Sequence, residues 1–207
     1  MPAVEHWRGA CLGVELLCLP LPGVVDASDL DVLSAAERSR ATAFGSERRR
    51  VEFVASRAHL RRALAAVLAR SAQDIEIQAA VSGKPQLVVG HLQFNLAHTA
   101  NAVLIGWGGR PLGVDLELAD RATTYIQRLP LLTQICAATG VGVVAAFTRV
   151  EAALKAIGRG LGTFKELRLD HIDASGACVF TTSQLVTIHA ATVPLPAGYV
   201  GSVAVVV

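Results

Sequence analysis

The sequence predicts an α+β protein with two comparable halves. Each half contains one long segment of helical periodicity, and short segments rich in β-branched residues surround it. Residues 53–61 also resemble residues 147–155 in their order of apolar and polar side chains. We therefore expect an amino-terminal subdomain over residues 1–102 and a carboxy-terminal subdomain over residues 103–207.

In the amino-terminal half, a strand is expected over residues 9–19, followed by two helices. The first helix begins after Ser34, because Ser34 and Glu37 have the spacing of a capping box. The second covers residues 47–70 and has arginines on one side. Its apolar side comprises Phe53, Val54, Leu60, Leu64 and Val67. Further strands are expected over residues 75–81, 93–98 and 102–107.

In the carboxy-terminal half, a strand is expected over residues 112–118. A helix is expected over residues 143–157, where apolar positions recur at helical spacing. Further strands follow over residues 166–172, 177–182, 185–193 and 199–207. Turn-forming residues such as Asp173-Ala174-Ser175-Gly176 separate them.

The charge of the chain gives little sign of a nucleic-acid partner. Its 207 residues can bury a sizeable core, and a net charge of +2 is too small to indicate nucleic acid. Six arginines are nevertheless concentrated in one stretch: Arg48, Arg49, Arg50, Arg57, Arg61 and Arg62. They either face an anionic ligand or form a solvated helix face, since long basic side chains also cover apolar surface.

The cysteines and the start of the chain favour a cytoplasmic protein. The four cysteines, Cys11, Cys18, Cys136 and Cys178, lack the Cys-x-x-Cys spacing of zinc and redox sites. The first residues contain no basic region followed by a long apolar core, so no signal peptide is expected. We therefore expect a cytoplasmic location and reduced thiols.

Residues 129–148 contain no charged side chain, which raises the question of a membrane span. Pro130, Gly140 and Gly142 interrupt this stretch and divide it into two short elements. We expect no membrane span. The stretch is either buried within the fold or contributes apolar surface that meets a partner protein.

Three carboxylates and one lysine have a spacing that brings them to one place. Asp115 and Glu117 are two positions apart in an expected strand, so their side chains point to the same face. Glu151 and Lys155 are four positions apart in an expected helix and share one helix face. Each pair alone is also typical of solvated surface. Together with the upstream segments Gly83-Lys84-Pro85 and 94–99, they predict a magnesium site formed by Asp115, Glu117 and Glu151, because Mg²⁺ prefers oxygen ligands.

Further motifs precede and follow these carboxylates. In order, the motifs are Gly83-Lys84-Pro85, Phe94-Asn95-Leu96-Ala97-His98-Thr99, Gly113-Val114-Asp115-Leu116-Glu117, Phe147-x-x-Val150-Glu151-x-x-x-Lys155 and Gly158-Arg159-Gly160-Leu161. Two helical motifs lie upstream, Leu33-Ser34-Ala35-Ala36-Glu37-Arg38 and Ser56-Arg57-Ala58-His59-Leu60-Arg61. The order of these motifs resembles that of the phosphopantetheinyl transferases of the surfactin-synthetase-activating type, over most of the chain.

The resemblance implies a fold of two α+β subdomains in a pseudo-twofold arrangement, with the active site between them. It implies an enzyme that transfers the phosphopantetheine arm of coenzyme A to a serine of an acyl or peptidyl carrier protein. Adenosine 3′,5′-bisphosphate is the other product. A monomeric chain is expected, with no membrane and no nucleic acid among its partners.

The resemblance also implies a role for each site residue. Asp115, Glu117 and Glu151 hold Mg²⁺, and Lys155 stabilises the departing phosphate. Either Glu151 or a metal-bound water takes the serine proton. Positions that in the family approach coenzyme A are matched here by Arg40, Arg57, Lys84 and His98.

Three positions depart from the family's pattern. Ala97 replaces a serine, Phe147 replaces a tryptophan, and Val150 replaces a basic residue. Two alternatives therefore stay open. Besides the transferase, the chain could be a degenerate, non-catalytic member that binds a carrier protein or synthase as a scaffold, or a different magnesium-dependent phosphoryl-transfer enzyme. The sequence contains no glycine-rich phosphate loop of the Gly-x-x-x-x-Gly-Lys-Ser type.

Overall fold

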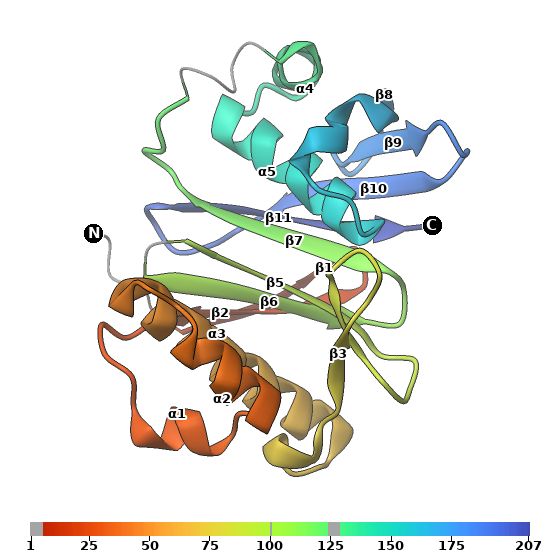
Figure 1. Ribbon diagram of the computed structural model, residues 1–207. Helices are drawn as coiled ribbons and strands as arrows, with labels where there is room; N and C mark the ends of the chain where they lie inside the picture. The colour runs from red at the N-terminus through yellow and green to blue at the C-terminus, as the bar shows by residue number, and fades with distance from the viewer. Residues whose placement is uncertain (1–5, 100, 124–128) are drawn as a thin grey trace.

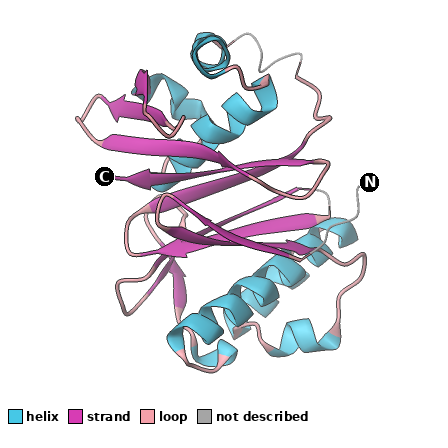
Figure 2. Ribbon diagram, turned by 180° about the vertical axis from the view of Figure 1, so that it is seen from behind, coloured by secondary structure: helices cyan, strands magenta, loops and turns pink. Residues whose placement is uncertain are grey.

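The computed structural model describes residues 6–99, 101–123 and 129–207. Two antiparallel sheets lie against each other at the centre, and helices cover the outer face of each (Figure 1, Figure 2). The predicted α+β class is therefore confirmed. The pseudo-twofold relation between the halves stays a prediction.

The first sheet has the strand order β1-β2-β6-β5. Its strands are β1 (Trp7–Cys11), β2 (Val14–Pro20), β5 (Gln93–Thr99) and β6 (Ala102–Gly108). The prediction of one strand over residues 9–19 is wrong, because the chain turns back at Leu12 and Gly13. Both residues have positive φ, 53° and 74°, as a tight hairpin turn requires.

Three helices lie on the outer side of this sheet: α1 (Ala27–Asp31), α2 (Ala35–Thr42) and α3 (Glu47–Leu68). The helix α3 packs on the sheet, whereas α1 and α2 pack against α3. The predicted capping box at the start of α2 is confirmed, because Ser34 and Glu37 each accept the other's backbone N–H. On α3, Leu60 and Leu64 are fully buried against the sheet. Val67 does not belong to this buried face, since 41% of its surface is exposed.

A small hairpin follows α3 and a short 3-10 helix, η1 (Ala72–Asp74). Its strands, β3 (Ile77–Ala79) and β4 (Pro85–Leu87), form a separate two-stranded sheet. The strand predicted over residues 75–81 is thus shorter than expected. Gly83 lies in its turn with φ 80°, a conformation that glycine adopts without strain.

The second sheet has the strand order β7-β11-β10-β9-β8. Its strands are β7 (Leu112–Leu118), β8 (Leu167–Ile172), β9 (Cys178–Thr182), β10 (Thr187–Val193) and β11 (Tyr199–Val206). The helices on its outer face are α4 (Pro130–Thr139) and α5 (Val143–Ala156), and the 3-10 helix η3 (Leu161–Glu166) follows. Each of the predicted elements of this half is present, with ends shifted by at most two residues.

The two sheets bury an apolar cluster between them that includes Leu16, Leu104 and Val114. Asn95 of β5 also crosses between the sheets, since its side-chain oxygen accepts a hydrogen bond from the Val114 N–H at 2.9 Å. The subdomain boundary predicted at residues 102 and 103 lies at the start of β6, which pairs with β2 and β5. The chain changes sheets after Gly108, in the loop before β7.

The uncharged stretch over residues 129–148 forms α4 and the start of α5. Leu132 and Ile135 are buried against α5 and the second sheet, so burial, and not partner contact, accounts for these side chains. Within the described parts of the chain, no single helix is long and apolar enough to cross a membrane. Among the described helices, one adjacent pair, α4 and α5, is long and apolar enough when taken together, and the two helices are bent by 114° relative to each other.

Candidate metal and anion site

The structure brings the three predicted carboxylates together. Asp115 and Glu117 alternate with buried Leu116 on β7, and Glu151 approaches them from α5. One oxygen from each of the three carboxylates lies within 4.8 Å of the other two. Asp115 is buried, whereas Glu117 and Glu151 are half-buried. The predicted strand and helix spacings therefore place these groups on facing surfaces.

Gly113 explains why β7 and α5 can approach so closely. A Cβ at this position would lie 2.1 Å from the Ala152 carbonyl oxygen and 2.5 Å from the Ala156 nitrogen. Both are backbone atoms of α5, so neither can move aside without deforming the helix. The glycine of the Gly-x-Asp-x-Glu motif is therefore required by packing.

Lys155 supplies a cation to the cluster. Its Nζ donates to Asp115 Oδ1 at 2.6 Å and lies 3.7 Å from Glu151 Oε2. The pKa of Glu151 is raised to about 7, first by burial and then by the adjacent Asp115 carboxylate, through repulsion and a shared hydrogen bond. Lys155 and Arg121 oppose this shift. Glu151 therefore exchanges its proton near neutral pH.

Arg121 is a second cation of the cluster, and the sequence reasoning missed it. Its guanidinium pairs with Glu117 and lies over the Phe147 ring, 4.5 Å from the ring centre. The four-residue spacing of Glu117 and Arg121 gave no signal, because β7 ends at Leu118 and this pair lies outside any helix. Phe147, at the family's tryptophan position, thus supports a cation beside the carboxylates.

The donor set fits a hard divalent cation. It consists of carboxylate oxygens, and Asp115 Oδ2 is buried without a hydrogen-bond partner among the described residues. Three carboxylates against the two cations Lys155 and Arg121 leave one net negative charge when all are ionised. An Mg²⁺ ion would satisfy the unpartnered oxygen and offset the remaining repulsion.

Lys84 lies beside this cluster, but its ammonium is already engaged. Nζ donates to the carbonyl oxygens of Leu112 at 2.6 Å, Lys155 at 2.9 Å and Ala156 at 3.5 Å. Burial lowers the pKa of Lys84 to about 8. The contact of Lys84 with coenzyme A stays a prediction. A phosphate that binds the ammonium would have to replace one of its hydrogen bonds to these carbonyl oxygens.

His98 lies at the exposed end of β5, within electrostatic reach of the cluster. Partial desolvation of the ring lowers its pKa, the Lys155 charge lowers it further, and Glu52 of α3 opposes both. His98 is therefore mostly neutral at pH 7, and it can donate or accept a hydrogen bond with an incoming ligand.

Arg40 and Arg57 form a separate cationic group on the amino-terminal half. Both guanidiniums lie over the Phe53 ring, at 5.3 and 5.6 Å from its centre, and both line a cavity of about 140 Å³. Arg57 is only 3.9 Å from Glu37, and one of its terminal nitrogens is buried without a hydrogen-bond partner among the described residues. The turn residue Gly83 closes another side of the same cavity.

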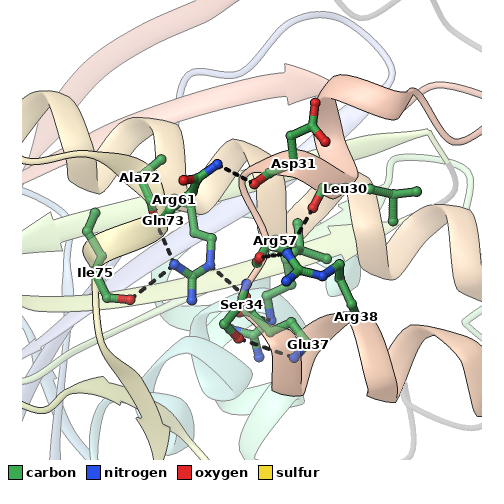
Figure 3. Close-up of polar contacts among 11 residues, drawn as sticks. Leu30, Asp31, Ser34, Glu37, Arg38, Arg57, Arg61, Ala72, Gln73 and Ile75 are labelled. Atoms are coloured by element: carbon green, nitrogen blue, oxygen red, sulfur yellow. Dashed lines mark hydrogen bonds and ion pairs between the residues drawn. The ribbon is translucent and has the colours of Figure 1, made fainter.

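Most of the remaining arginine run has a structural explanation. Arg61, which is 1% exposed, donates to Glu37 at 2.6 Å and to the carbonyl oxygens of Ala72 and Ile75 (Figure 3). The other ion pairs of α3 are Arg48 with Glu52, Arg50 with Glu47 and Arg62 with Asp29. Of the run, Arg57 alone lines the cavity with Arg40.

Two further cavities lie near the end of α5, and only the smaller of them is lined by Lys155. One of about 260 Å³ lies between the halves and is lined by Lys84, Asn95 and Lys155. The larger, of about 540 Å³, includes Thr163 and Gln184 in its lining. Both cavities are lined by Ser82, Gly158, Arg159 and Gly160, so they adjoin each other at this motif.

A comparison of the sequence with protein-family models finds no model that matches, and a comparison with curated proteins finds no match either. Membership of the transferase family therefore stays an expectation from the motifs. The geometry of the carboxylate cluster and its cations is the basis on which a function can be assigned.

Proposed function

We propose that the chain is a magnesium-dependent phosphopantetheinyl transferase that uses coenzyme A to modify a serine of an acyl or peptidyl carrier protein. The observation that carries this proposal is the meeting of Asp115, Glu117 and Glu151 within 4.8 Å beside the Lys155 ammonium. Carboxylates gathered in this way suit a divalent cation, and a neighbouring lysine suits a phosphate.

The side chains suit each task in the transfer. The serine oxygen forms a bond to the β-phosphorus of coenzyme A, and the bond from that phosphorus to the bridging oxygen breaks. Glu151 accepts the serine proton; its pKa is raised to about 7 in the metal-free protein, and a bound cation would lower it. Lys155 stabilises the negative charge on the departing adenosine 3′,5′-bisphosphate. Bound by the three carboxylates, Mg²⁺ would supply neutralisation of the pyrophosphate charge.

Two features support coenzyme A as the donor. The cavity lined by Arg40 and Arg57 offers two guanidiniums, one with an unpartnered buried nitrogen, as a phosphate group requires. Gly83 of the hairpin turn and Pro85 of β4 line both this cavity and the one beside Lys155, so a long ligand can contact both. His98, at the end of β5, adds a neutral hydrogen-bonding group.

The test is the intact mass of several acyl and peptidyl carrier proteins after incubation with this protein, coenzyme A and Mg²⁺. We expect a carrier to gain the mass of one phosphopantetheine arm, and to gain nothing when Mg²⁺ is removed by a chelator. A carrier whose target serine is replaced by alanine is the matched control. Failure of every carrier would count against the transferase.

A non-catalytic scaffold is the second candidate. It is favoured by the two internal cations, because Lys155 and Arg121 already pair with Asp115 and Glu117 and can hold the cluster together without a metal. Calorimetry with coenzyme A, followed by the carrier assay, separates the two candidates. Binding of coenzyme A without any mass change on the carriers would favour the scaffold.

A further inference from the structure

The β3–β4 hairpin is held to the amino-terminal half by Ile77 and Leu87, which pack against the apolar cluster beneath α3. It forms a sheet of only two strands, and such hairpins are marginally stable by themselves. Its turn is closed by the N–H of Ala80, which donates to the Lys84 carbonyl, and by the N–H of Gly83, which donates to the Ala80 carbonyl. Lys84 lies at the end of this turn, where its side chain reaches the carboxy-terminal half.

The Lys84 ammonium joins two elements of that half. It donates to the carbonyls of Lys155 and Ala156 at the end of α5, and to the Leu112 carbonyl at the start of β7. The last carbonyls of a helix lack intrahelical partners and carry partial negative charge, so a cation there is stabilising. An ammonium has three N–H donors, and these three acceptors use all of them.

These two elements carry the whole carboxylate cluster. Asp115 and Glu117 follow Leu112 on β7, and Glu151 and Lys155 occupy the last turns of α5. A change in the distance between the end of α5 and the start of β7 would therefore change the 2.6 Å contact between Lys155 and Asp115.

We propose that Lys84 is a positioning residue: it fastens the hairpin turn to α5 and β7 and thereby sets the separation at which Lys155 and the three carboxylates face one another. The inference deepens the proposed function, because the cluster it concerns is the proposed active site. It assigns Lys84 to the framework of the site, whereas Arg40, Arg57 and His98 remain the groups available to the ligand.

The test compares Lys84→Met with Lys165→Met, which removes an exposed lysine outside the site. The first readout is amide hydrogen exchange of the ligand-free protein over residues 78–88 and 153–160. In Lys84→Met we expect exchange in both segments to become about tenfold faster, as for the loss of a hydrogen bond to a charged group. The second readout is Mn²⁺ affinity, which should fall about tenfold, as for loss of a group that orients metal ligands. Lys165→Met should change neither.

Each outcome decides the inference. Faster exchange in both segments together with weaker Mn²⁺ binding supports it. Unchanged exchange, or unchanged Mn²⁺ affinity in a folded variant, overturns it, and loss of coenzyme A binding alone would make Lys84 a ligand contact. If Lys84→Met does not fold, the inference is tested by amide hydrogen exchange of the parent protein at low urea concentration. The two segments are then expected to open as one unit, and independent opening would overturn the inference.

The exchange readout needs neither metal nor coenzyme A. If the transferase assay fails but residues 78–88 and 153–160 exchange faster together in Lys84→Met, the positioning role is still supported. If the transferase is active but the two segments do not respond together, the positioning role is refuted and the proposed enzyme function is retained.

Discussion

Gly113 lies directly against Ala152, so that a methyl group on Gly113 would come within 2.1 Å of the Ala152 carbonyl oxygen. This packing brings the strand with Asp115 and Glu117 against the helix with Glu151 and Lys155. Close approach of two backbones requires a residue without a side chain. One contact between two small residues therefore permits the close approach of four charged ones.

Gly113→Ala should destabilise the fold and disrupt the cluster. The added carbon meets backbone atoms, so we expect a loss of about 2 kcal/mol or more in the free energy of unfolding, as for overpacking of a core. Urea denaturation measures this loss. The matched control is Gly109→Ala, because a Cβ there has no heavy atom within 4 Å. Equal effects in the two variants would contradict the packing role of Gly113.

Glu151→Ala and Asp115→Ala should abolish most transfer and any stabilisation by Mg²⁺ with coenzyme A. Without metal, we expect the melting temperature of Glu151→Ala to be unchanged or slightly higher, because carboxylates that repel each other are costly to bury. Asp115→Ala also removes the 2.6 Å partner of Lys155, although Glu151 remains near that ammonium at 3.7 Å. Thermal melts with and without both ligands measure these effects.

The control for these melts is Asp170→Ala, since Asp170 pairs with Arg168 outside the cluster. This variant should keep the full ligand-induced shift of the parent protein. If Asp115→Ala and Glu151→Ala keep it as well, the proposed metal site is wrong.

The stability of the metal-free protein should decrease as the pH rises from about 4.5 to about 7. The pKa of Glu151 is about 7 in the folded protein, whereas its ordinary value is 4.5, so the folded chain holds this proton more tightly. Stability from this proton is fully present below pH 4.5 and is lost as the pH passes 7, with ~1.4 kcal/mol at stake for each unit of pKa difference.

Glu151→Gln is the comparison for this pH dependence. We expect urea unfolding of the variant to lack the decrease assigned to Glu151, while other titrating groups contribute equally to both proteins. In the parent, Mg²⁺ affinity should rise over the same pH range, because the metal requires the ionised carboxylate. Identical pH profiles for parent and variant would refute the assignment.

The sequence predicted the elements of the carboxy-terminal half well because their signals are local. Apolar periodicity defined α5, and alternation on β7 placed Asp115 and Glu117 on one face. The convergence of Glu151 on that face was expected from the order of the motifs and their resemblance to the transferase family, because neither spacing alone relates the helix to the strand. Leu12 and Gly13 were missed as a turn because the flanking apolar residues continue the pattern of a strand on both sides.

Contacts between distant segments could not be predicted in the same way. Nothing in residues 84, 155 and 156 alone indicates that the Lys84 side chain meets carbonyl oxygens of a helix that begins nearly sixty residues later. The different roles of Arg57 and Arg61 could not be predicted either, since both lie on α3 and differ only in the residues that surround them. That difference leads to a prediction.

Arg61→Met should reduce the stability of the fold, whereas Arg57→Met should reduce ligand binding. Arg61 is buried and bonded to Glu37 and two carbonyls, so its loss should cost about 3–5 kcal/mol of stability, because Glu37 loses a buried ionic partner. Arg57 has an unpartnered nitrogen, so its loss should change stability little and weaken adenosine 3′,5′-bisphosphate binding about tenfold or more. Urea denaturation and calorimetry measure the two quantities on both variants. An Arg57 variant that is unstable but binds the bisphosphate normally would place the anion site elsewhere.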